Sequence, residues 1–199
     1  LQGWVRDNSD VQSTTGSLAH AIWVVAEGSG SITVEIANNT ISRFGLVGID
    51  VQSRGGVGTN VNATITGNTI SEGTGPEPYA GIGMHAGNGT SGENSRLCVN
   101  LANNNIAVDV SGTKGAIADQ YLEQYAGTEF DIQGLTPPSG ATASQVEGYV
   151  AGKDTNGAGA GVYVEPAMPP EIAVNYTAGD CDTPVAPLLA AGGEGAGVA

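Results

Sequence analysis

The sequence predicts an all-β protein whose centre is a short right-handed parallel β-helix, a solenoid in which successive coils of the chain stack. Short runs of β-branched and other apolar residues alternate with polar residues, and turns rich in glycine and asparagine separate these runs. Charged residues make up 13% of the 199 residues, which is too few for a helical bundle. An internal repeat is the third observation, and it decides between the possible all-β architectures.

Three segments of the first half share a pattern in which an alternating β run leads into asparagine, one further residue and isoleucine. The segments span residues 34–41, 63–70 and 99–106. Their asparagines are Asn39, Asn68 and Asn104, and their isoleucines are Ile41, Ile70 and Ile106. A fourth, weaker copy is expected at residues 21–26, and a second β run follows within a copy, as at 48–51.

The shared phase of asparagine and isoleucine favours a solenoid over a meander, which would reverse the chain at each turn. In a solenoid, equivalent positions stack about 4.8 Å apart. We therefore expect the three isoleucines to form an apolar ladder inside the coils. The three asparagines should form an amide ladder beside it, at corners where asparagine tolerates a left-handed backbone.

The phrases Ala-Asn-Asn-Thr-Ile at 37–41 and Thr-Gly-Asn-Thr-Ile at 66–70 resemble the coils of right-handed parallel β-helix proteins. More narrowly, they resemble large bacterial surface and autotransporter-like proteins with such repeats. Residues 130–149 are similar to the segment that closes the repeat region in those proteins. The resemblance spans about residues 18 to 150, and it implies an architecture more than an activity.

The second half of the chain is expected to cap the solenoid. We expect coils over residues 1–110, a capping region with one short helix and a few strands over 111–185, and a flexible tail over 186–199. The helix is predicted at 142–150, with Thr142 or Ser144 as its N-cap. Other expected elements are a helical turn or irregular strand within 114–125 and strands at 130–132, 162–165 and 172–176.

Charge and cysteine content bound the partners and the compartment. The net charge is −14 with six Lys and Arg in total, which argues against nucleic acid as a partner. No apolar run is long enough to span a membrane. Cys98 and Cys181 are predicted to form one disulfide in a secreted or cell-surface protein, the alternative being two unrelated buried thiols.

Some parallel β-helices are polysaccharide lyases or hydrolases, which need facing carboxylates or an acidic metal cluster. The carboxylates of the repeat share no phase; they are Glu35, Asp50, Glu72, Glu77 and Glu93. Asp50 and His85 make the best pair, but two solvated, outward-facing residues explain them more simply. His20 is expected to be a packing residue. The sequence thus predicts a protein that is not an enzyme and has no cofactor or metal.

The leading functional hypothesis is an extracellular structural or adhesive protein, such as a self-assembling fibre or surface-layer subunit. Its expected partner is a second copy of itself, because the strand-like run containing Leu1, Trp4 and Val5 has no evident partner in its own repeat. The alternative is that residues 1–16 fold over their own first coil. The alternative function is a polysaccharide-binding or polysaccharide-degrading β-helix, which an aromatic groove with paired carboxylates would favour.

Overall fold

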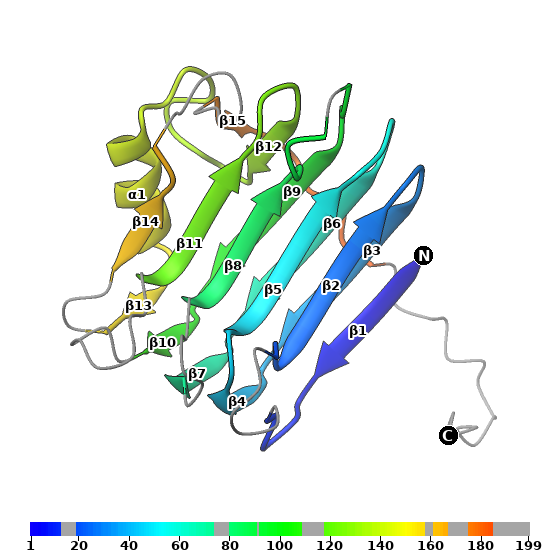
Figure 1. Cartoon of the computed structure of the whole chain (residues 1–199). Helices are drawn as coiled ribbons and strands as arrows, with labels where there is room; N and C mark the ends of the chain where they lie inside the picture. The colour runs from blue at the N-terminus through cyan, green and yellow to red at the C-terminus, as the bar shows by residue number, and fades with distance from the viewer. Residues whose placement is uncertain are drawn as a thin grey trace, which may run out of the picture.

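The computed structural model describes residues 1–12, 19–73, 80–90, 92–108, 118–157, 161–166 and 175–184. These residues form three sheets in which every strand pairing is parallel, so the chain is the parallel β-solenoid that the sequence predicts (Figure 1). Strand β1 and helix α1 lie at opposite ends of the stack (Figure 1). Among the described residues, no helix is long and apolar enough to cross a membrane.

Each coil contributes to three sheets, which we call A, B and C. Sheet A has the order β1 (Gln2–Arg6), β3 (Ser31–Ala37), β6 (Asn60–Thr66), β9 (Arg96–Ala102), β12 (Glu129–Ile132), β15 (Thr177–Ala178). Sheet B has the order β13 (Thr155–Asn156), β10 (Asn105–Ala107), β7 (Thr69–Gly73), β4 (Thr40–Phe44). Sheet C has the order β14 (Val162–Val164), β11 (Ala118–Gln124), β8 (Ala80–Ala86), β5 (Val47–Arg54), β2 (Ile22–Glu27).

The repeat holds, but its extent differs from the prediction in two ways. Residues 21–26 are not a fourth copy of the first β run, because β2 pairs with β5 in sheet C and thus corresponds to the second run. The first run of that coil is β1, which pairs with β3. At the other end, β11 is a regular strand that pairs with β8, and β12 pairs with β9. The coils therefore continue past residue 110, where irregular sequence hides the repeat.

The isoleucines and asparagines lie in the ladders that the alignment predicts. Ile41, Ile70 and Ile106 are register partners in sheet B and are fully buried. Asn39 donates through Nδ2 to Oδ1 of Asn68 at 2.9 Å, and Asn68 donates in the same way to Asn104 at 2.9 Å. Each of these three amides also donates to a backbone carbonyl, so the buried polar groups are satisfied.

The asparagine ladder is longer than predicted, and its backbone explanation needs a correction. Asn8 donates to Asn39 at 2.7 Å, and Asn104 donates to Asp154 at 3.0 Å, which extends the ladder at both ends. The left-handed residue of each corner is the one before the ladder asparagine. These residues are Asp7, Asn38, Gly67 and Asn103, with φ between 55° and 64°. The ladder asparagines are thus selected for their side-chain amides and not for a left-handed backbone.

The disulfide between Cys98 and Cys181 is confirmed, with Cα atoms 5.4 Å apart. Cys98 lies between the core residues Leu97 and Val99 on β9, so its side chain is on the outer face of sheet A. Asp182 also donates its backbone N–H to Asn62, the register partner of Cys98. The part of the C-terminal segment that follows β15, residues 179–184, therefore crosses the outer face of sheet A.

The helix begins at its predicted N-cap. Thr142 caps α1 (Ala143–Ala151) through a capping box with Gln145, and Val146 and Val150 are buried beneath the helix. Gly152 ends the helix. The strand expected at 162–165 is β14, whereas most of the strand expected at 172–176 and the predicted tail at 186–199 lie outside the described residues.

The N-terminal run, expected to lack a partner in its own repeat, pairs with the following coil of the same chain. β1 pairs with β3 over its whole length, and the Leu1 ammonium donates to the carbonyl of Ser31 at 2.8 Å. The Leu1 side chain is 89% exposed, while Trp4 and Val5 are half-buried. In the described structure, β1 is the end strand of sheet A.

Candidate functional site

The outer face of sheet C carries the candidate site. Strand alternation turns one set of side chains away from the core, and parallel register aligns them across coils. One row along the solenoid axis consists of Trp23, Asp50, Gly83, Tyr121 and Tyr163. The next row contains Gln52, His85 and Glu123.

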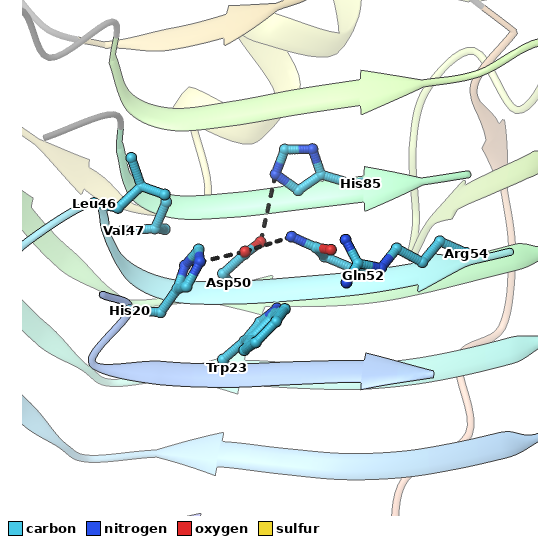
Figure 2. Close-up of a pocket in the computed structure, with 8 residues that line it drawn as sticks. All are labelled: His20, Trp23, Leu46, Val47, Asp50, Gln52, Arg54 and His85. Carbon is cyan, nitrogen blue, oxygen red and sulfur yellow. Dashed lines mark hydrogen bonds and ion pairs between the residues drawn. The ribbon is translucent and has the colours of Figure 1, made fainter. Parts of the chain in front are cut away.

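These two rows border a groove of about 370 Å³ over strands β2, β5 and β8 (Figure 2). Its lining residues are His20, Trp23, Leu46, Val47, Asp50, Gln52, Arg54 and His85. Gly83 keeps the space in front of Asp50 and His85 open, because a Cβ atom at this position would lie 3.2 Å from Asp50 Oδ1 and 3.2 Å from His85 Nε2.

Asp50 lies at the centre of the groove, and its side chain is 1% exposed. Its Oδ2 accepts a hydrogen bond from Gln52 Nε2 at 2.5 Å and lies 3.1 Å from His20 Nδ1. Its Oδ1 lies 3.4 Å from His85 Nε2 but has no hydrogen-bond donor among the described residues. The opposite ring nitrogen of His85, Nδ1, lies 3.0 Å from Glu123 Oε2. The cluster thus runs from His20 through Asp50 and His85 to Glu123.

Burial shifts the pKa values of Asp50 and His20 toward their uncharged forms. Desolvation raises the pKa of Asp50, and the attraction of His85 and His20 offsets this only in part. Desolvation also lowers the pKa of His20 in spite of its proximity to Asp50. His20 and Asp50 are therefore a close polar pair whose charged forms are both disfavoured by the loss of water.

Trp23 forms the aromatic wall of the groove and is 52% exposed. Its ring stacks on His20 with centroids 5.1 Å apart and an interplanar angle of 19°. The guanidinium of Arg54 lies 5.6 Å from the centroid of the same ring. Arg54 is also paired with Glu27 at 2.9 Å, so a carboxylate already compensates its charge. The groove therefore combines an accessible aromatic surface with a buried acceptor.

The structure brings together the two residues that the sequence paired, but the interpretation of them changes. Asp50 is not a solvated surface residue, because neighbouring coils bury it, and His85 bridges it to Glu123. His20 does pack on an aromatic ring, as expected, and it also faces Asp50. Sequence reasoning missed Trp23 and Glu123. The run at 118–124 gave no signal for Glu123, because its polar residues occur in adjacent pairs, Asp119–Gln120 and Glu123–Gln124, and so do not mark one face of the strand.

The other carboxylates considered from the sequence lie elsewhere. Glu35 is ion-paired with Arg6 on sheet A. Glu93 is buried and accepts hydrogen bonds from the backbone of Gly55 and Asn88, so it holds two loops together. Glu77 and the side chain of Glu72 lie outside the described part of the chain. Within that described part, no group of three or more His, Cys, Asp or Glu side chains is arranged to hold a metal ion.

Comparisons with family models, curated proteins and solved structures find no match to this chain. Its function therefore has to be inferred from the chemistry of the groove on sheet C.

Proposed function

We propose that the protein is an extracellular adhesive protein that binds saccharides through the groove on the outer face of sheet C. The observation that carries this proposal is the exposed ring of Trp23 next to the buried carboxylate of Asp50 on a rigid sheet. A sugar ring presents an apolar C–H face that stacks on an aromatic ring, and hydroxyl groups that donate to carboxylates and amides. A concave site with apolar walls and a few convergent polar groups suits such a ligand.

The extracellular setting is supported by the disulfide, since such bonds persist in oxidising compartments. The resemblance of the coils to repeat-containing bacterial surface proteins supports the same setting. The two long faces of the solenoid also differ in a way that favours sheet C as the binding face. The C-terminal segment crosses the outer face of sheet A, whereas the groove on sheet C is open.

We propose binding without cleavage of the saccharide. A glycosidase places the scissile bond between two carboxyl groups. Asp50 and Glu123 contact opposite nitrogens of the His85 ring, so the imidazole occupies the space between these two carboxylates. This arrangement orients polar groups for recognition and leaves no room there for a glycosidic bond.

Binding is tested first by affinity electrophoresis in gels that contain neutral polysaccharides. A polysaccharide that slows the migration of the protein is then cut into oligosaccharides, and their affinity is measured by calorimetry. Trp23→Ala should weaken binding at least about tenfold, because a loss of about 1.4 kcal/mol of stacking free energy corresponds to this factor. Trp4→Ala is the matched control, since Trp4 lies on β1 in sheet A, away from the groove. Equal affinities for the wild type and both variants would refute the proposal.

A further inference from the structure

We propose that Asp50 determines the specificity of this groove by accepting a sugar hydroxyl on Oδ1, and that the groove thereby selects neutral saccharides over anionic ones. This inference rests on the proposed saccharide binding and extends it to the class of ligand. It depends on an unpaired acceptor, on the tautomer of a neighbouring histidine, on an open space and on the local charge.

The first step is the unpaired oxygen. A buried carboxylate oxygen without a donor costs free energy, and such atoms are uncommon unless a ligand or water completes them. Asp50 Oδ2 accepts a hydrogen bond from Gln52, while Oδ1 is turned toward His85, 3.4 Å from its Nε2 (Figure 2), and has no hydrogen-bond donor among the described residues. A hydroxyl group from a ligand in the groove would supply this donor.

The second step is the tautomer of His85. A neutral imidazole has one N–H donor and one acceptor nitrogen. Glu123 Oε2 lies 3.0 Å from Nδ1, and in the tautomer with its proton on Nδ1 the ring donates to Glu123. Nε2 is then an acceptor that lies 3.4 Å from Asp50 Oδ1. With this tautomer and an ionised Asp50, two acceptors face the same space, and a hydroxyl of a ligand would supply the donor.

The third step is the shape of this space. Gly83 is the register partner of Asp50, and its missing side chain leaves room in front of both acceptors. A Cβ atom here would lie 3.2 Å from each of them and 3.3 Å from Val47 Cγ1, a distance at which the neighbours would have to shift. The backbone of Gly83 is not in the left-handed region, so the glycine is not required by the strand itself. Alanine at this position would close the space without demanding a new backbone conformation.

The fourth step is charge. Asp50 and Glu123 bring carboxylates to the groove, and the whole chain carries a net charge of −14. Among the lining residues, Arg54 is the one Lys or Arg side chain, and Glu27 already pairs with it. A uronate or sulfate group in the groove would be repelled by these carboxylates, and no unpaired Lys or Arg among the lining residues would offset the repulsion. A neutral sugar carries no such charge, and its hydroxyls can donate to the acceptors of the groove.

Asp50→Asn is the variant that tests the inference. The amide is isosteric, can keep the hydrogen bond from Gln52 through its oxygen, and can donate through its nitrogen to His85 Nε2. It therefore fills the acceptor site from within while preserving the fold. We expect at least tenfold weaker binding of neutral hexasaccharides by calorimetry, together with an unchanged or raised melting temperature. Gly83→Ala should weaken the same binding by steric closure.

The ligand class is tested with a neutral hexasaccharide and an oligogalacturonate of equal length, measured on the full chain. Binding of the neutral sugar in preference to the oligogalacturonate, and its loss in Asp50→Asn, would support the inference. Preference for the oligogalacturonate would overturn the inference and leave saccharide binding intact. Unchanged affinity in Asp50→Asn, where Trp23→Ala abolishes binding, would do the same. Binding of neither sugar, nor of any neutral polysaccharide, would overturn the proposed function as well.

Discussion

Replacing Ile70 with alanine should strongly destabilise the solenoid, because Ile70 is the middle member of the isoleucine ladder. Its side chain is fully buried, with Ile41 and Ile106 as register partners on the coils before and after it. The substitution removes three buried carbon atoms, worth about 0.8 kcal/mol each in transfer free energy. The neighbouring coils are held in register by backbone hydrogen bonds and cannot collapse into the space, so a cavity term adds to this loss. We expect a total cost of about 3 to 4 kcal/mol, within the range found for such core truncations.

This cost is measured by urea denaturation and by calorimetry at neutral pH. For a chain of this size it corresponds to a fall in melting temperature of about 6 to 15 °C. Ile32→Ala is the matched control, since Ile32 lies on β3 in the same solenoid but is only half-buried, and it should cost about 1 kcal/mol. If Ile70→Ala costs no more than Ile32→Ala, the ladder does not carry the stability assigned to it.

Two further predictions concern pH and assembly. Burial raises the pKa of Asp50, so protonation of Asp50 stabilises the folded state fully below the pKa of the unfolded chain, about 3.9, and this stabilisation is lost as pH rises through the folded-state pKa. Thermal unfolding across pH 3 to 8 should show this loss in the wild type but not in Asp50→Asn. Parallel curves of melting temperature against pH for the two proteins would contradict this prediction. The backbone groups of Leu1 and Asp7 form hydrogen bonds with the β3 side of the sheet, and successive residues of a strand direct their backbone groups to opposite sides. The N–H of Gln2 therefore points away from β3. We propose that this free edge of β1 pairs with a second copy of the chain. Light scattering should show assembly that increases with salt and that Gln2→Pro prevents, whereas a monomer at all salt and Ca²⁺ concentrations would refute self-association.

The features that the sequence predicted are those that repeat from coil to coil. Ile41, Ile70 and Ile106 occupy equivalent positions in the core, and Asn39, Asn68 and Asn104 bond to one another, so each coil imposes the same requirement on its sequence. Local chemistry likewise identified Thr142 as the N-cap of α1. The disulfide was predicted from composition and compartment, while its placement on the outer face of sheet A was not.

The tertiary structure decided which outward-facing side chains meet. Trp23, Asp50, His85 and Glu123 come from β2, β5, β8 and β11, and nothing in the core requires their types to repeat. Loops of different length separate these strands along the chain, so spacing in the sequence does not reveal that Asp50 is opposite Gly83 or that His85 is opposite Glu123. Parallel hydrogen bonding sets that register, and the close stacking of coils then buries Asp50 between two histidines. The sequence by itself therefore determined the solenoid through its repeating interior, whereas the groove on sheet C exists only because backbone pairing brings unlike residues of successive coils into contact.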